Sequence, residues 1–122
     1  MQRKIAAALA AAAVGAIALL LSLPATAAQT TVMGEVGPGY TIGLTIGGKK
    51  VKKLKAGVKY RFVIADRSED HDFRLNGPRT SKVLSGEGFR GTKVTVLTFR
   101  KGTYNFYCAP HSDEMYGRFV VA

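Results

Sequence analysis

Hydrophobic and polar positions alternate along much of the chain after residue 28. Apolar side chains stand at every second position from Val58 to Ile64, with Lys59 and Arg61 between them. Because successive residues of a strand face opposite sides of a sheet, this pattern predicts a strand with one buried face. Similar β-branched and aromatic runs recur between glycine-rich turns, as is typical of an all-β sandwich or barrel. We predict strands over residues 31–36, 40–46, 51–54, 58–66, 71–75, 93–100, 103–108 and 118–121.

Two of these strands carry a potential metal ligand on the face expected to be buried. His71 stands two positions before Phe73, and Cys108 stands two positions after Phe106. Residues two apart share a face of a strand, so both ligand candidates should point inward at a strand end. A site at one pole of a sandwich would be built there.

Size and charge indicate one small basic domain. The chain of 122 residues has 18 Lys and Arg against 8 Asp and Glu, a formal net charge of +10. Without the leader described below, about 95 residues remain, so we expect one domain over residues 28–122. The charge attracts anionic partners. Zinc-knuckle, helix-turn-helix and aromatic-basic platform motifs are absent from the sequence, so we expect no nucleic-acid partner.

Much of the positive charge falls in one cluster, for which two interpretations stay open. The cluster is a docking patch for an acidic partner, or it keeps a solvated hairpin soluble and protects a sheet edge from pairing. The second is favoured. The cluster consists of Lys49, Lys50, Lys52, Lys53, Lys55 and Lys59.

Residues 1–27 predict a secretory signal peptide. Arg3 and Lys4 precede an apolar run over residues 5–21, and Pro24 precedes the small residues 25–27. This order is typical of a leader cleaved at an A-x-A site, here after Ala27 or Ala28. The alternative is an uncleaved membrane anchor, since the run approaches the roughly 20 apolar residues that span a bilayer. We expect an exported protein, in a bacterial periplasm or at a cell surface.

Three potential ligands of a soft metal ion follow one another as C-x2-H-x3-M, namely Cys108, His111 and Met115. They are too closely spaced for one straight strand, so the chain must turn and can direct all three side chains at one centre. The remaining histidine, His71, would supply a fourth ligand. Two imidazoles, a thiolate and a weak axial thioether suit both Cu(I) and Cu(II) and form the blue-copper electron-transfer site.

A catalytic cysteine or a zinc site would account for fewer of these residues. A single cysteine, histidine or methionine is often an ordinary core or surface residue, but their coincidence favours one metal site. A Cys-His nucleophile is disfavoured because no orienting acid or oxyanion loop is evident. A structural zinc site made of His71, Cys108, His111 and Asp113 would leave Met115 unused.

The surroundings of the cysteine predict its electronic state. Cysteine binds metal as the thiolate, and the histidines would bind as neutral imidazoles. Pro110 has no backbone N–H and cannot donate to the sulfur, which should leave the thiolate more electron-rich.

Two segments, HDFRLNGP at 71–78 and GTYNFYCAPHSDEMYGRFVV at 102–121, resemble the cupredoxins, in particular the plastocyanin and amicyanin branch. The resemblance implies a Greek-key β-sandwich with type 1 copper near one end. It implies a structural role for Tyr104. The copper ligands would be His71, Cys108, His111 and Met115.

Two features depart from that family pattern. The gap from His111 to Met115 is one residue shorter than in plastocyanin and one longer than in amicyanin. Asp72 stands where an asparagine commonly ties the two ligand segments together. Because a carboxylate cannot donate a hydrogen bond unless protonated, we expect this tie to be weakened here.

These features predict an exported, monomeric one-electron carrier that cycles between Cu(I) and Cu(II) and is not an enzyme. In the family the edge of the C-terminal histidine reaches the surface, so His111 is the predicted electron port. The basic surface favours a redox partner with an acidic docking surface, held by salt-sensitive contacts. Membrane contact is expected only through an uncleaved leader or a membrane-bound partner. The alternative function is a non-redox copper chaperone or copper-resistance protein.

Overall fold

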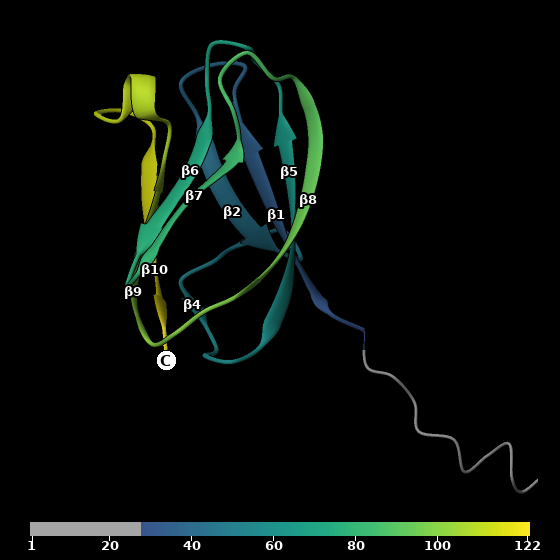
Figure 1. Ribbon diagram of the computed structural model, residues 1–122. Helices are drawn as coiled ribbons and strands as arrows, with labels where there is room; N and C mark the ends of the chain where they lie inside the picture. Colours follow the sequence, from purple (N-terminus) through teal and green to yellow (C-terminus); the bar gives the residue numbers. More distant parts are fainter. Residues whose placement is uncertain (1–27) are drawn as a thin grey trace, which may run out of the picture.

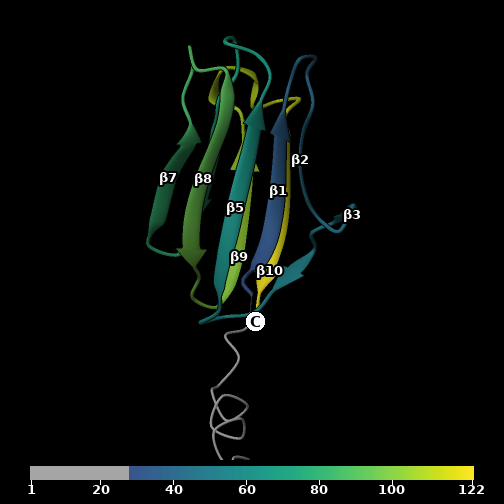
Figure 2. The same cartoon turned by 90° about the vertical axis from the view of Figure 1, so that its right-hand side faces the viewer.

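Two five-stranded sheets pack face to face (Figures 1 and 2). The computed structural model describes residues 28–122, and the predicted signal peptide, 1–27, lies outside the described residues. The first sheet has the order β3 (Lys49–Lys50), β2 (Ile42–Ile46), β1 (Thr30–Val36), β5 (Lys59–Asp66) and β8 (Gly91–Thr98). The second has the order β4 (Lys53–Leu54), β10 (Tyr116–Val121), β9 (Gly102–Tyr107), β6 (Phe73–Gly77) and β7 (Thr80–Ser85).

The connections repeatedly cross from one sheet to the other. Strands β1 to β3 lie in the first sheet, β4 in the second, β5 in the first, β6 and β7 in the second, and β8 in the first. β1 pairs in parallel with β5, and β10 in parallel with β4, whereas the other pairs are antiparallel. Connections of this kind define a Greek-key sandwich, so the predicted fold class is confirmed.

The core between the sheets follows from the alternation in the sequence. In β5 every second residue from Tyr60 to Asp66 is buried. At the end of the core away from η1, the Tyr104 ring stacks on Phe119 with centroids 5.4 Å apart, and Phe99 packs edge-on against Tyr104 at 4.9 Å. The fully buried Tyr104 hydroxyl donates to the Arg100 carbonyl at 2.9 Å, which supports its expected structural role.

The strands differ from the prediction, among other places, at the start of β6 and in β7. The strand predicted from residue 71 begins at Phe73, because a side-chain-stabilised turn precedes it. In this turn Asp66 accepts from the Ser68 N–H, and the Ser68 hydroxyl accepts from the Asp70 N–H. The sequence pattern does not predict β7. This strand is a sheet edge in which only Leu84 and Ser85 are buried, so it lacks the alternation that marks a half-buried strand.

One end of the sandwich gathers the segments that matter for function. β1 and β5 end there, β6 begins there, and the chain leaving β9 forms the 3-10 turn η1 (Ala109–His111) there (Figure 1). We call this the metal end. Within residues 28–122, no helix is long and apolar enough to cross a membrane.

Candidate metal centre

The loop from Cys108 to Met115 is closed by its own backbone. β9 and β10 pair up to Tyr107 and Tyr116, and beyond this pair the Cys108 N–H donates to the Met115 carbonyl at 3.0 Å. The His111 carbonyl accepts from the Met115 N–H at 2.9 Å. Pro110 lies in the first turn of η1, where its missing N–H is not needed. The loop therefore turns His111 back over Cys108.

His71 is held from the other side by the loop after β1. Gly37 has a φ of +71°, and a Cβ built there would lie 3.0 Å from both His71 Cδ2 and Ser68 Cβ. Glycine allows this close approach in a backbone conformation that other residues rarely adopt. His71 is 3% exposed, so its ring is fixed by packing.

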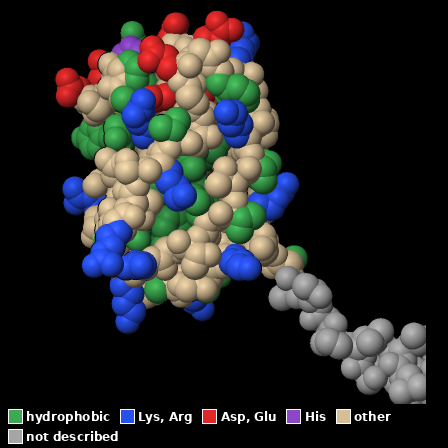
Figure 3. Space-filling view, in the orientation of Figure 1, with side chains coloured by type: hydrophobic (Ala, Val, Ile, Leu, Met, Phe, Trp, Pro, Cys, Tyr) green, Lys and Arg blue, Asp and Glu red, His purple; other side chains and the backbone are tan. Residues whose placement is uncertain are grey.

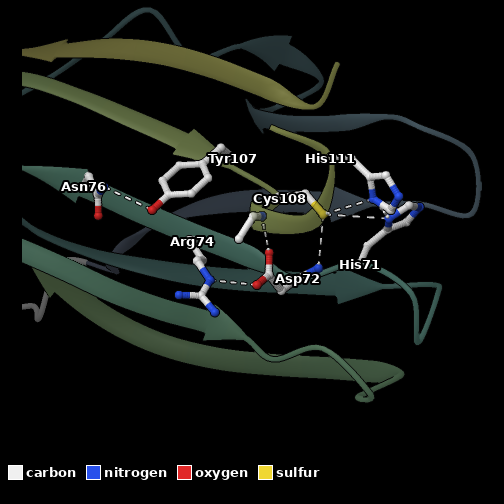
Figure 4. A network of polar contacts seen from close by, with 8 residues as sticks. His71, Asp72, Arg74, Asn76, Tyr107, Cys108 and His111 are labelled. Atoms are coloured by element: carbon white, nitrogen blue, oxygen red, sulfur yellow. Dashed lines mark hydrogen bonds and ion pairs between the residues drawn. The ribbon is translucent and has the colours of Figure 1, made fainter. Parts of the chain in front are cut away.

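Three donor atoms meet at the metal end (Figure 4). The two Nδ1 atoms of His71 and His111 lie 3.1 Å apart, and Cys108 Sγ lies 3.7 Å from each of them. The structure thus brings together three of the four residues predicted as ligands. Met115 lies in the same loop, is fully buried, and is bound to Cys108 through its backbone. Its role as axial ligand stays a prediction.

The spacing of these atoms fits a bound ion. The centre of the triangle they form lies about 2.0 Å from each atom. Bonds from imidazole nitrogen and thiolate sulfur to a zinc ion are ~2.0 to 2.3 Å long, and copper is of similar size. Two imidazoles and one thiolate around a single point match a trigonal copper site. His71 lies just before β6 and Cys108 just after β9, so the packing of the strands places these donor atoms at the distances that a copper ion needs.

The zinc alternative loses its fourth ligand. Among residues 28–122, the cluster of metal-binding side chains consists of His71, Cys108 and His111, with no carboxylate. Asp113, considered above as a zinc ligand, is exposed.

Asp72 ties the two ligand segments together, which corrects the expectation of a weakened tie. Its Oδ1 accepts from the Ala109 N–H at 2.7 Å, and its own N–H donates to Cys108 Sγ at 3.4 Å. Its Oδ2 accepts from Arg74 Nε at 2.7 Å. The expectation was wrong because the carboxylate needs only to accept here. Arg74 thus forms an ion pair with the fully buried Asp72 carboxylate, and this contact raises the pKa of the Arg74 guanidinium.

The Cys108 thiol sits in a dry environment. Burial raises the pKa of the Cys108 thiol, while the backbone N–H groups of Asp72 and His111 act in the opposite direction. Without metal the sulfur therefore holds its proton at neutral pH, and a bound cation would displace it. Pro110 has no N–H to offer the sulfur. Because the N–H groups of Asp72 and His111 act on it instead, the expected gain in electron density on the thiolate stays a prediction.

Tyr40 is a neighbour of the site that the sequence did not reveal. Its ring lies edge-on to His111 at 4.9 Å and to His71 at 5.8 Å between centroids, although the side chain is 59% exposed. It helps line a cavity of about 500 Å³ beside the two histidines. The sequence pattern places Tyr40 in a strand; it lies instead in the loop before β2, 31 positions from His71 in sequence, and no local pattern marks such a contact.

Comparison with known proteins agrees with this geometry. Residues 54–122 match the family model described as copper binding proteins, plastocyanin/azurin family. Among solved structures, rusticyanin from Thiobacillus ferrooxidans is 19% identical, with a TM-score of 0.56, over 80% of this chain and 79% of that one. Reduced rusticyanin is 20% identical, with a TM-score of 0.55, over 80% of this chain and 82% of the other. At these identities the structures show the fold alone.

Among curated protein sequences, none is significantly similar to this chain. The family match nevertheless covers more than half of the chain, including Cys108, His111 and Met115 as well as His71. The chain belongs to the plastocyanin/azurin family of copper-binding proteins.

Proposed function

We propose that this chain is an exported type 1 copper protein that carries single electrons between redox partners. The observation that carries the proposal is the donor triangle of His71, Cys108 and His111, whose centre lies at bonding distance from all three atoms. Met115 would be the axial ligand. When bound, copper supplies a one-electron couple between Cu(II) and Cu(I).

Burial of the donors favours an electron carrier over a protein that releases its metal. Cys108 is fully buried and His71 is 3% exposed, and each is held by a backbone hydrogen bond within its own loop, from Cys108 N–H to the Met115 carbonyl and from His71 N–H to the Ser68 carbonyl. Residues held in this way keep their positions when the charge of the centre changes. Buried donors also make it difficult for a bound ion to leave. A copper chaperone must release its ion to a target protein, so this burial disfavours that function.

His111 is the proposed electron port. It is the more exposed of the two histidines and is followed and preceded by exposed residues, Ser112 and Pro110. An electron can therefore pass between the sulfur-bound centre and a docked protein through one imidazole ring. No substrate bond is made or broken, so the protein acts as a carrier and not as an enzyme.

Export rests on the leader predicted over residues 1–27. An unpaired cysteine is exposed to oxidation outside the cytoplasm unless it is buried or bound to metal. Cys108 is buried, and copper would occupy its sulfur. These features favour work in a periplasm or at a cell surface.

Addition of Cu(II) to the purified apoprotein tests the assignment. We expect an intense visible colour from sulfur-to-copper charge transfer, and its loss in Cys108→Ser. Ser112→Ala, an exposed change in the same loop, is the matched control and should keep the colour. A colourless wild-type complex would end the type 1 assignment. Fast, reversible one-electron voltammetry supports the carrier, whereas sluggish voltammetry with metal transfer to an apoprotein identifies a chaperone.

A further inference from the structure

Acidic and basic side chains are separated along the length of the sandwich. Figure 3 shows the Asp and Glu side chains gathered at the metal end, near a histidine, whereas Lys and Arg are spread over the whole face, including a part of the metal end. The three loops of this end, residues 66–72, 86–90 and 109–115, hold seven acidic residues against two arginines and no lysine. All but one of the chain's 8 Asp and Glu therefore lie here.

Five of these acidic side chains are exposed, and none of the five is in an ion pair. The two ion pairs among residues 28–122 are Arg67 with Glu35 and Arg74 with Asp72. The loops' negative charge is thus open to an approaching molecule. The exposed acidic residues are Glu69, Asp70, Glu87, Asp113 and Glu114.

Two of them stand beside the proposed electron port. Asp70 and Glu87 line the same cavity as His71, His111 and Tyr40. Asp70 directly precedes His71 in sequence, and Asp113 follows His111 by two residues. A molecule that reaches the edge of His111 must therefore approach through a negative field.

The lysines at the opposite, lysine-rich end of the sandwich, Lys53, Lys55 and Lys59, are too distant to cancel this field at physiological salt. Lys50 pairs with Thr45 and lies about midway along the sandwich. β5 runs from Lys59 to Asp66, so it joins the lysine-rich end to the metal end. Seven steps of ~3.3 Å along a strand make about 23 Å. This is about three times the Debye length of ~8 Å at 0.15 M salt. Charges at the port therefore act with little influence from the far lysines.

We propose that the metal end docks onto a cationic surface, so that the partner exchanging electrons through His111 presents Lys or Arg there. This inference rests on the proposed electron-carrier function. The net charge by itself predicted an acidic partner, but the positions of the charges direct an anionic surface to the lysine-rich end, away from His111. The same separation orients the protein as it approaches a partner.

Small redox reagents of opposite charge test the sign of the field at the port. The copper-loaded, reduced protein is mixed with tris(phenanthroline)cobalt(III), a trivalent cation, or with ferricyanide, a trivalent anion. We expect the rate with the cation to fall and the rate with the anion to rise as salt increases. A rate with ferricyanide that falls with salt would follow the net positive charge and overturn the proposal.

Paired variants assign the field to named residues. Asp70→Asn with Glu87→Gln should slow the cobalt reagent at low salt by about two- to sevenfold per carboxylate removed. Lys53→Gln with Lys59→Gln removes the same number of charges at the far end, and should change that rate by less than about twofold. Equal effects of the two pairs contradict the proposal.

A second measurement needs no copper and separates this inference from the proposed function. Hexaamminechromium(III), a paramagnetic trivalent cation, is added to the apoprotein, and broadening of amide NMR signals is followed. Signals around Asp70, Glu87 and Asp113 should broaden first, and hexacyanochromate(III) should instead broaden the signals of residues 53–59. If the two reagents broaden the opposite sets of signals, the cationic docking surface is refuted, even if the protein binds copper. If the signals broaden as expected but the protein gives no colour with Cu(II), only the electron-carrier function is refuted.

Discussion

Asp72 and Ala109 join the two halves of the candidate metal centre: the Asp72 carboxylate accepts from the Ala109 N–H at 2.7 Å. Asp72 directly follows His71, and Ala109 directly follows Cys108. One short hydrogen bond therefore fixes the backbone beside one donor relative to the backbone beside another. Because the Asp72 side chain is fully buried, water cannot replace it as a partner.

Removal of this carboxylate should cost stability before any metal is bound. Asp72→Ala leaves the Ala109 N–H without its acceptor and Arg74 without its charge partner. We expect the free energy of unfolding of the apoprotein to fall by about 2 to 4 kcal/mol. Urea denaturation at pH 7 measures the change. Asp72→Asn retains an oxygen that can accept from Ala109 and should lose less, so an equal loss in both variants would contradict this role.

Gly37 should be required for the position of His71. In Gly37→Ala the new methyl group lies 3.0 Å from His71 Cδ2, in a backbone with a φ of +71°. We expect a loss of stability of about 1 to 2 kcal/mol and a copper affinity lowered by about tenfold or more. Metal titration against a competing chelator measures the affinity. Gly39→Ala is the control, because a Cβ there meets nothing within 4 Å.

Copper uptake should release a proton from Cys108 and become tighter as the pH rises. Burial raises the pKa of the Cys108 thiol, so the thiol is protonated at neutral pH and must lose its proton to bind metal. At neutral pH and up to the thiol pKa, the apparent affinity should rise about tenfold per pH unit, because one thiol proton is released for each ion bound. Copper titrations in a weak buffer with a pH indicator measure the released proton. Release of no proton near pH 7.5 would contradict the raised pKa.

The same shift predicts how the stability of the apoprotein depends on pH. A thiol whose pKa is raised by folding stabilises the folded state below its unfolded pKa of ~8.5, and this contribution is lost as the pH rises above it. We therefore expect urea stability to decrease from pH 7.5 towards pH 10 in the reduced wild type. Cys108→Ser should show a smaller decrease, since it lacks the titrating group.

The Tyr40 ring should shield the two histidines from water. Tyr40→Ala removes the ring that lies 4.9 Å from His111 and admits solvent, which favours the more highly charged Cu(II). We expect the reduction potential to fall by about 20 to 60 mV, a change of about two- to tenfold in the preference for Cu(II). Tyr40→Phe keeps the ring and should leave the potential nearly unchanged. Tyr116→Ala, at a residue that is 68% exposed, is the control for loss of a surface tyrosine.

The sequence predicted the parts of the structure that depend on local periodicity and on residue chemistry. Alternation identified the buried face of β5, and the spacing of Cys108 and His111 required a turn that brings both to one point. β7 escaped prediction because an edge strand needs no alternation, and its first four residues are not buried. The position of Tyr40 over the histidines depends on the course of an entire loop, which no short pattern encodes. The acidic residues of the metal end lie in three loops that are far apart in the sequence. Only the fold brings these loops to one end, so their common location could not be predicted.

The pairing of β4 with β10 has a consequence for how the protein is made. Lys53 of β4 lies opposite Val120 of β10, so the second sheet is completed by residues 67 positions apart in sequence. Such distant pairing delays folding until nearly all of the polypeptide is available. The donor triangle of His71, Cys108 and His111 therefore forms only after synthesis of the domain is almost complete.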